Sequence, residues 1–197
     1  QRFVADAAHE LHTPLTALRT HLELIGERTG VDHGAALARL DHLRTLADDL
    51  LDLSRIEARA QETPARPVNV PALARSLSEV YASQAEQSDV DFALTLPDAP
   101  AIVRGDPQQL TRMLANLLDN ALKFTPEGGT VALELHRNGG PHLDLTVRDT
   151  GIGIPPDDLP TLFERFRRGR NAAAYPGSGL GLAIVKAVAE AHGGTVC

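Results

Sequence analysis

The sequence has a single cysteine, no tryptophan and no surplus of basic residues. With Cys197 alone, a disulfide framework is excluded and a reducing compartment is favoured. The net charge of −7 argues against a nucleic-acid-binding surface, because no basic excess is available to neutralise phosphates. No apolar run approaches the ~20 residues needed to cross a bilayer, and we find no signal peptide. We therefore expect one or two cytoplasmic domains that contact neither nucleic acid nor membrane.

Two long helical patterns fill the first third of the chain. Apolar residues recur every three or four positions over residues 1–28 and 35–61, with a short loop at 29–34. Such helices form an antiparallel hairpin, which leaves a leucine-rich seam uncovered. The rest of the chain could cover this seam, but we favour a homodimer that forms a four-helix bundle, since the following segment carries its own core. The seam of the second helix comprises Leu37, Leu40, Leu43, Leu46, Leu50, Leu53 and Ile56.

After a proline-containing linker at residues 63–67, strand and helix patterns alternate. Asp106, Pro107 and Gln109 have the order of an N-cap, a first-turn proline and the partner residue of a capping box. We expect an α+β sandwich in which one sheet is covered by helices on one face. The predicted strands are 90–96, 101–104, 130–136 and 142–148, and the predicted helices are 71–88, 106–124 and 180–192.

His9 lies opposite the apolar stripe of the first helix, with Glu10 beside it in sequence and Thr13 one turn further on. An exposed imidazole next to a carboxylate is a plausible pair of nucleophile and base. The alternative is a solvated histidine without a role. The metalloprotease zinc motif is excluded, because its second histidine would have to stand where Thr13 stands.

The helix at 106–124 carries an unusual set of side chains on one side. Asn116, Asn120, Lys123 and Phe124 stand at i, i+4, i+7 and i+8. Amide oxygens suit Mg²⁺ and a lysine offers its charge to phosphate, so this side fits a nucleotide. An ordinary exposed polar face is the alternative.

Two glycine loops follow. Asp149, Gly151 and Gly153 close a strand, where the carboxylate could accept a hydrogen bond from an exocyclic amine and the glycines would let a flat ring approach. A second loop with glycines at 177, 179 and 181 precedes the last helix, and such turns bind anions through free N–H groups. Neither loop fits the Rossmann or Walker A pattern, and the protein-kinase signatures are absent.

Taken together and in this order, these stretches resemble the sensor histidine kinases of two-component signalling. Residues 9–15 resemble the phosphoacceptor box, residues 116–124 the N box and residues 149–154 the G1 box. Residues 162–166 resemble the F box, residues 177–182 the G2 box and residues 192–195 the last glycine box. The resemblance implies a dimerisation and phosphotransfer hairpin at 1–62, a linker at 63–66, and a Bergerat-type α/β sandwich that binds ATP at 67–197 and lacks its closing strand.

The resemblance also assigns roles. His9 would accept the γ-phosphate of ATP, Glu10 would remove the ring proton, and Thr13 would orient water when phosphate is removed from the partner. Residues 155–180 would form a mobile lid. The partners would be a second copy bound through residues 1–62 and the receiver domain of a response regulator. The chain itself would be the cytoplasmic portion of an inner-membrane sensor. The nucleotide positions would be Asn116, Asn120 (also holding Mg²⁺), Lys123, Phe124, Asp149, Gly151, Gly153, Arg168, Gly177, Gly179, Leu180 and Gly181.

Two other interpretations have to be weighed. One is an ATPase or serine kinase of the gyrase and chaperone superfamily, against which His9 and the leucine-seamed hairpin argue. The other is a dimeric module without catalysis, against which Asn120, Lys123 and Asp149 argue. The sequence also departs from the family pattern, since Ala8 stands where serine is frequent and His12 where arginine is frequent. His12 adds a second imidazole to the phosphoacceptor box.

Overall fold

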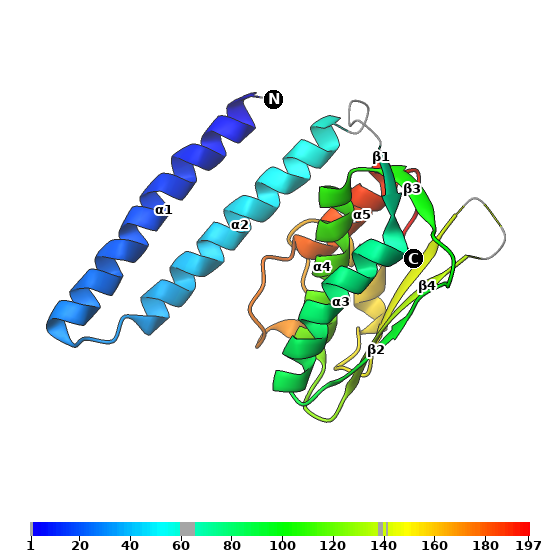
Figure 1. Ribbon diagram of the computed structural model, residues 1–197. Coiled ribbons are helices and arrows are strands. Elements are labelled where there is room, and N and C mark those ends of the chain that lie inside the picture. The colour runs from blue at the N-terminus through cyan, green and yellow to red at the C-terminus, as the bar shows by residue number, and fades with distance from the viewer. Residues whose placement is uncertain (1, 60–65, 138–139, 141) are drawn as a thin grey trace.

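A computed structural model describes residues 2–59, 66–137, 140 and 142–197, with the side chains of residues 2–13, 58 and 59 outside the description. The chain begins with two antiparallel helices, α1 (Arg2–Thr29) and α2 (Gly34–Arg59), which lie side by side (Figure 1). The proline at position 14 is accommodated within α1. Arg19 of α1 bonds Asp41 of α2 at 2.8 Å, which fixes the register of the hairpin. The predicted hairpin is confirmed, with helix ends within about two residues of the expected ones.

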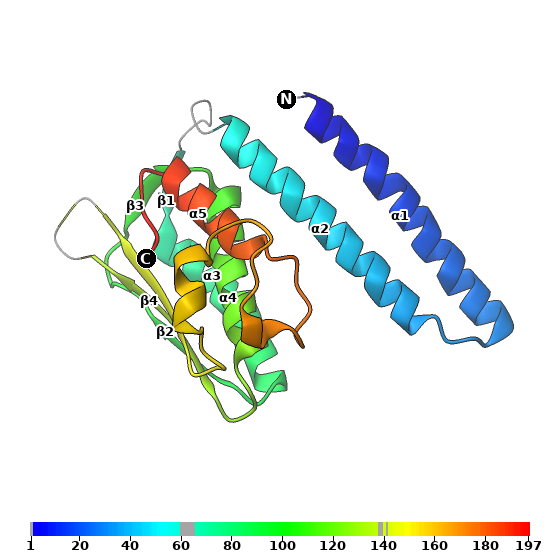
Figure 2. The ribbon, with the colours of Figure 1, turned by 180° about the vertical axis from the view of Figure 1, so that it is seen from behind.

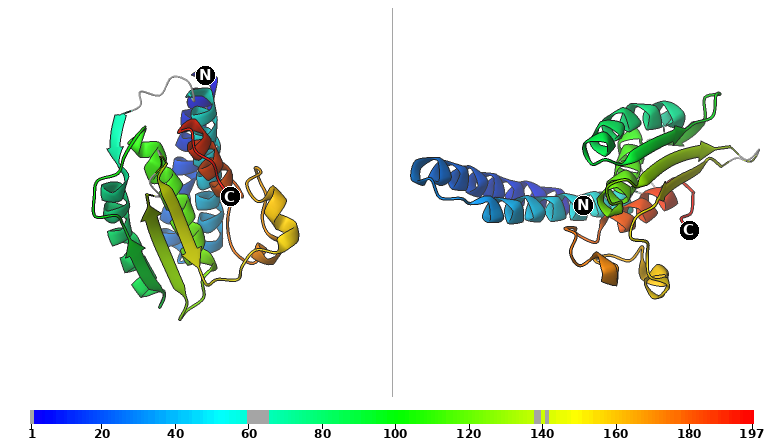
Figure 3. Two further views of the ribbon diagram at one scale, coloured as in Figure 1. Left: turned by 90° about the vertical axis from the view of Figure 1, so that its right-hand side faces the viewer. Right: turned by 90° about the horizontal axis from the view of Figure 1, so that it is seen from below.

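The second part packs helices against strands. In Figures 1 and 2, helices α3, α4 and α5 gather on the same side of the strands. The hairpin projects away from this part, as the right-hand view of Figure 3 shows. The elements are β1 (Arg66–Asn69), α3 (Val70–Gln87), β2 (Asp91–Thr95), β3 (Ile102–Gly105), α4 (Pro107–Phe124), β4 (Thr130–His136), β5 (Asp144–Asp149), the 3₁₀ turns η1 (Pro156–Thr161) and η2 (Arg170–Ala172), and α5 (Gly181–Ala191).

The strands form two sheets where the sequence predicted one. Strand β4 pairs in parallel with β2 and antiparallel with β5, whereas β1 and β3 form a separate antiparallel pair. The expectation of one sheet was wrong because β1 was not recognised. It begins at Arg66 and contains Pro67, inside the segment that was taken as a linker. Proline lacks an N–H and is tolerated on a short edge strand. The other expected linker residues lie outside the described part of the chain.

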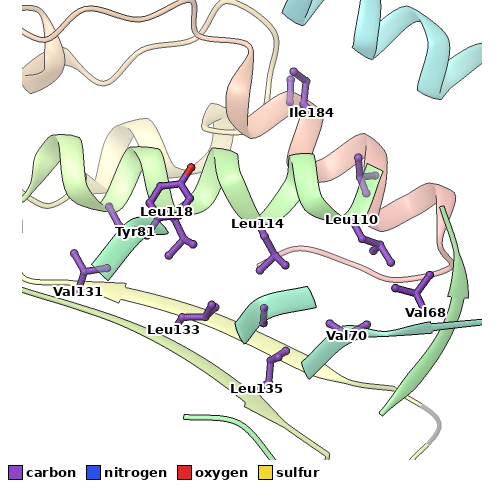
Figure 4. Packing of buried hydrophobic residues seen from close by; sticks show 14 of the residues in the cluster. Val68, Val70, Tyr81, Leu110, Leu114, Leu118, Val131, Leu133, Leu135 and Ile184 are labelled. Atoms are coloured by element: carbon purple, nitrogen blue, oxygen red, sulfur yellow. The ribbon is translucent and has the colours of Figure 1, made fainter. Parts of the chain in front are cut away.

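The core lies between α4 and the larger sheet. Leu114 and Leu118 of α4 are fully buried and point towards Val131, Leu133 and Leu135, the inward residues of β4 (Figure 4). Each such side chain contributes roughly 1.5–3 kcal/mol by leaving water. Because the buried side of α4 is held by these contacts, its opposite side has a fixed orientation, and that side carries the asparagines.

The start of α4 differs from the predicted capping box. Asp106 caps the helix by accepting a hydrogen bond from the Gln108 N–H at 2.8 Å, as expected. The backbone N–H of Asp106, however, donates to Nε2 of His192 at 3.1 Å, and the buried Oε1 of Gln109 has no hydrogen-bond partner within the described residues. The ring of His192 lies so close to Gly105 that a Cβ there would be 2.2 Å from its Cδ2 atom. His192, just after α5, therefore supplies the acceptor for the Asp106 N–H that Gln109 was expected to supply.

The leucine seam of α2 has more than one neighbour. Leu53, only 2 % exposed, and Ile56 belong to the same buried cluster as the residues of α4 and α5. Leu40 and Leu51 are also buried but stand outside that cluster, and α1 is the other neighbour of α2. The expectation that the whole seam faces a dimer partner was therefore wrong for its C-terminal part. Large apolar side chains that stay exposed on the described part of the two hairpin helices are Leu18, Leu24, Ile25, Leu43 and Leu50.

Among the described residues, no helix has both the length and the apolar character needed to span a bilayer.

Candidate functional site

The polar side of α4 faces the glycine loop that precedes α5. A Cβ on Gly181 would lie 2.9 Å from Oδ1 of Asn116 and 3.8 Å from Nδ2 of Asn120. Asn116 is oriented by a hydrogen bond from its Nδ2 to the carbonyl oxygen of Arg112 at 2.9 Å. The start of α5 thus lies against both amides, and a residue larger than glycine at position 181 would press on the amide oxygen of Asn116.

Lys123 extends the same cluster by one turn. Its Nζ atom would be 2.7 Å from a Cβ on Gly177, and it lies 4.6 Å from the centroid of the Phe124 ring. Burial lowers the pKa of Lys123, and the nearby charge of Arg168 lowers it further, against a smaller opposing effect of Asp119. The half-buried ammonium of Lys123 and the exposed guanidinium of Arg168 together favour an anion at this place.

An aromatic and arginine contact closes one edge of this cluster. The rings of Phe124 and Tyr175 meet edge to face with centroids 5.0 Å apart. Arg168 donates hydrogen bonds to the carbonyl oxygens of Tyr175 and Ala172, the latter at 2.8 Å. Arg168 therefore holds the segment that brings Tyr175 to Phe124. Tyr175 was not among the predicted site residues.

The first glycine loop lies against the C-terminal end of α4. Gly151 N–H donates to Oδ1 of Asp149 at 2.9 Å, and Ile152 N–H donates to the carbonyl oxygen of Phe124 at 3.1 Å. A Cβ on Gly151 would be 2.3 Å from that same carbonyl oxygen. Asp149 is exposed and has a second carboxylate oxygen, which suits it to accept from a ligand amine.

The expected lid is tied to this loop and to itself. Asn171 donates to the carbonyl oxygen of Gly153 at 2.9 Å. Arg170 forms ion pairs with Asp157 at 2.8 Å and Asp158 at 3.2 Å. Asn171 was missed because a single asparagine in an irregular segment has no spacing or pattern to mark it.

The loop before α5 also contacts the hairpin. Gly179 has a φ of +71°, which glycine adopts without strain, and this turn places Ser178 and the buried Leu180 at the start of α5. Leu180 N–H donates to Oγ of Ser178 at 3.1 Å, and that hydroxyl donates to Oδ2 of Asp49 at 2.8 Å. Asp49 also pairs with Arg112 of α4. None of these partners is close in sequence to Asp49.

Comparison with known proteins identifies both parts of the chain. Residues 1–59 match the family described as the His Kinase A (phospho-acceptor) domain. Residues 105–197 match the family of histidine kinase-, DNA gyrase B- and HSP90-like ATPases. A solved structure of the mycobacterial sensor histidine kinase MprB is 40 % identical to this chain and has a TM-score of 0.59. The match covers 65 % of this chain and 82 % of that structure.

The chain belongs to the sensor histidine kinases. This family acts in two-component signal transduction and uses ATP.

Other members of the histidine kinase family extend the match. The histidine-protein kinase/phosphatase MprB of Mycolicibacterium smegmatis is 42 % identical over 99 % of this chain and 41 % of its own length. The MprB of Mycobacterium tuberculosis is 43 % identical over 98 % of the chain and 40 % of its own length. The full-length structure of ShkA in complex with AMPPNP is 30 % identical, with a TM-score of 0.75 over 98 % of the chain and 41 % of that protein. The chain thus spans about two fifths of these curated relatives.

In this histidine kinase, the predicted nucleotide residues gather along α4 and the two glycine loops, whereas the predicted phosphoacceptor residues lie elsewhere. His9, Glu10 and Thr13 belong to α1, and their side chains lie outside the described part. The Arg19–Asp41 contact sets His9 level with about residue 51 of α2, since antiparallel helices rise equally. His9 is therefore within one helical turn, along the hairpin axis, of the levels of Asp49 and Asp52.

The residues of this histidine kinase fit a nucleotide with its cation. Within the described residues, no group of three or more His, Cys, Asp or Glu side chains could hold a metal ion. A cation at Asn120 would therefore need phosphate oxygens as further ligands, which is how Mg²⁺ binds in many nucleotide sites. The side chain of Asn120 is half-buried, and its amide oxygen is of the kind that binds Mg²⁺.

Proposed function

We propose that the chain is the catalytic core of a sensor histidine kinase that phosphorylates His9 from ATP and passes the phosphate to an aspartate of a response regulator. The observation that supports this best is the close approach of Gly177 to Lys123 and of Gly181 to Asn116. Glycines at these positions let the loop backbone, whose N–H groups can bind phosphate, lie directly beside the amide of Asn116 and the ammonium of Lys123.

In the proposed reaction, a ring nitrogen of His9 attacks the γ-phosphorus of ATP. A P–N bond forms, the bond to the bridging oxygen breaks, ADP leaves, and Glu10 takes the ring proton. Mg²⁺ held by Asn120 would neutralise phosphate charge. Lys123 and Arg168 add positive charge, and Asp149 would accept a hydrogen bond from the adenine amine. The remaining proposed contacts to the nucleotide come from Asn116, Phe124, Gly151, Gly153, Gly177, Gly179, Leu180 and Gly181.

We propose that residues 1–62 form a homodimer and that residues 67–197 form the ATP-binding domain, with a linker at 63–66. The exposed apolar side chains of Leu18, Ile25, Leu43 and Leu50 support a partner helix on the hairpin. A receiver domain would bind near His9, and Thr13 would orient water when the same site removes its phosphate. The similarity to longer sensor kinases supports a place in the cytoplasmic portion of a membrane-anchored protein.

The direct test is incubation with γ-labelled ATP and Mg²⁺, followed by treatment of the labelled protein with acid and with alkali. A phosphohistidine loses its label in acid and keeps it in alkali, whereas a phosphoserine behaves in the opposite way. Release of labelled inorganic phosphate without any labelled protein would instead support the simple ATPase.

A further inference from the structure

The carboxylate of Asp49 is buried at the junction between the hairpin and the ATP-binding part. It is 4 % exposed, and both of its oxygens are used: Oδ1 accepts from Arg112 of α4 and Oδ2 accepts from Oγ of Ser178 at 2.8 Å. A buried carboxylate persists only when it is paired in this way. Asp49 therefore holds the loop before α5 and the helix α4 on the surface of α2.

The hydroxyl that Asp49 holds stands at the centre of the proposed phosphate site. Ser178 follows Gly177, which lies against Lys123, and precedes Gly181, which lies against Asn116. Its Oγ also accepts the N–H of Leu180 at 3.1 Å. Free N–H groups at a helix start are the donors that bind anions. Both the hydroxyl and this N–H are thus engaged in a chain of hydrogen bonds that ends on the Asp49 carboxylate.

A phosphate in that position would meet the same carboxylate. Two hydrogen bonds in series through the Ser178 hydroxyl span roughly 5 Å, and like charges at that separation repel strongly at a partly buried site. Arg112 offsets only part of this repulsion, since Asp52 also lies 3.5 Å from its Nε atom. Nucleotide and Asp49 therefore compete for Ser178.

We propose that Asp49 is a latch that holds the ATP-binding domain on its own α2 helix until nucleotide displaces it. This inference rests on the proposed function, in which the loop at 177–181 binds the phosphates of ATP. By the register of the hairpin, Asp49 lies about 3 Å along the axis from the level of His9. The latched domain is held at the height of the phosphoacceptor but on α2, whereas His9 is on α1. The coupling is reciprocal: if bound nucleotide weakens the contact between the domain and α2, then that contact lowers the affinity of the domain for nucleotide.

The test compares binding of AMPPNP with Mg²⁺ to the wild-type chain, Asp49→Asn and Asp41→Asn by calorimetry. Asp49→Asn keeps the shape and an acceptor oxygen but removes the charge. We expect this variant to bind AMPPNP roughly fivefold more tightly, which is a small effect among known couplings between two binding sites. Asp41→Asn is the matched control, because Asp41 is an exposed carboxylate of the same helix that pairs with Arg19 of α1 and not with the ATP-binding part. Its affinity should equal that of the wild type.

A second measurement needs no substitution. In the wild-type chain, amide hydrogen exchange at residues 46–56 of α2 should become faster when AMPPNP binds, because the docked domain leaves this surface. Unchanged or slower exchange, or an Asp49→Asn variant that binds no better than the wild type, would overturn the latch while leaving the ATP site intact. Failure of wild type and variants alike to bind AMPPNP would overturn the proposed function and the latch with it.

Discussion

The hairpin and the ATP-binding domain use their apolar residues in different ways. The domain closes a core of its own, in which residues of α4, α5 and β4 contact one another. Among the side chains that the structure describes, the hairpin forms no buried cluster of its own: Leu53 and Ile56 of α2 are buried with the domain, while Leu43 and Leu50 remain exposed. A helix pair that divides its apolar surface among neighbours depends on each of them for stability. The ATP-binding domain is therefore stabilised mainly by contacts within itself, whereas the hairpin that carries the proposed phosphoacceptor is stabilised by contacts with other parts.

The largest expected effect is the loss of phosphorylation when the proposed acceptor in the hairpin is replaced. Replacing His9 by glutamine should eliminate the labelled phosphoprotein while AMPPNP binding is retained, because the proposed acceptor is on α1 and the proposed nucleotide residues are on α4 and the glycine loops. His12→Arg is the control and should keep most of the label, since His12 has no carboxylate next to it in sequence. Label that persists in the His9 variant and disappears with His12 would show that the wrong histidine was assigned.

The complementary change on the domain side is Asn120→Ala. It removes the proposed oxygen ligand of Mg²⁺ from a half-buried polar side, so nucleotide binding that depends on Mg²⁺ should be abolished with little change in the melting temperature. Gln108→Ala removes an exposed amide from the same helix and should bind as the wild type does. An Asn120 variant with unchanged affinity and an unchanged requirement for Mg²⁺ would remove this residue from the site.

The division of apolar surface along α2 predicts different outcomes for two leucines one turn apart. Leu53→Ala leaves a cavity in the cluster shared with the ATP-binding domain and should cost about 2–4 kcal/mol of unfolding free energy. Leu50→Ala, at a position 47 % exposed in one chain, should cost much less in a monomer and should weaken the proposed dimer instead. Denaturant unfolding and sedimentation of both variants give the two quantities. Equal losses of unfolding free energy for the two variants would contradict the assignment of Leu53 to the core of the domain and of Leu50 to the proposed dimer interface.

The smallest effect is expected at the ion pair between Glu57 of α2 and Arg165 of the lid. Both side chains are about half exposed, so solvent screens the pair. Glu57→Gln should lower the free energy of unfolding by less than about 1 kcal/mol. A loss as large as that of Leu53→Ala would place the main attachment of the domain at the lid rather than at Asp49 and Leu53.

The sequence predicted most elements because their signals are local. The periodicity of α1 and α2, the N-cap at Asp106 and the alternation of β4 each lie within a few residues. The glycine loops and the side of α4 that carries Asn116 were likewise identified from short spacings, and the structure brings them together. The roles assigned to these residues remain predictions.

The features that the sequence did not predict depend on contacts between distant segments. Strand β1 is four residues long, and its pairing with β3 outweighs a local composition typical of a linker. Asp49 meets Arg112 and Ser178 across separations of 63 and 129 residues, which no motif records. The capping box failed for the same reason, because His192 reaches Asp106 from 86 residues away.

The contact between Gly105 and His192 has an evolutionary consequence. Any larger residue at position 105 would push the imidazole out, and the amide of Asp106, at the start of the helix that bears the asparagines, would lose its acceptor. A residue without a hydrogen-bond acceptor at position 192 would leave the same amide unsatisfied, at a cost of about 1–3 kcal/mol where it is buried. Neither position can drift alone without penalty. We therefore expect the two to covary among related sequences, so that glycine at the first accompanies histidine at the second and both are replaced together.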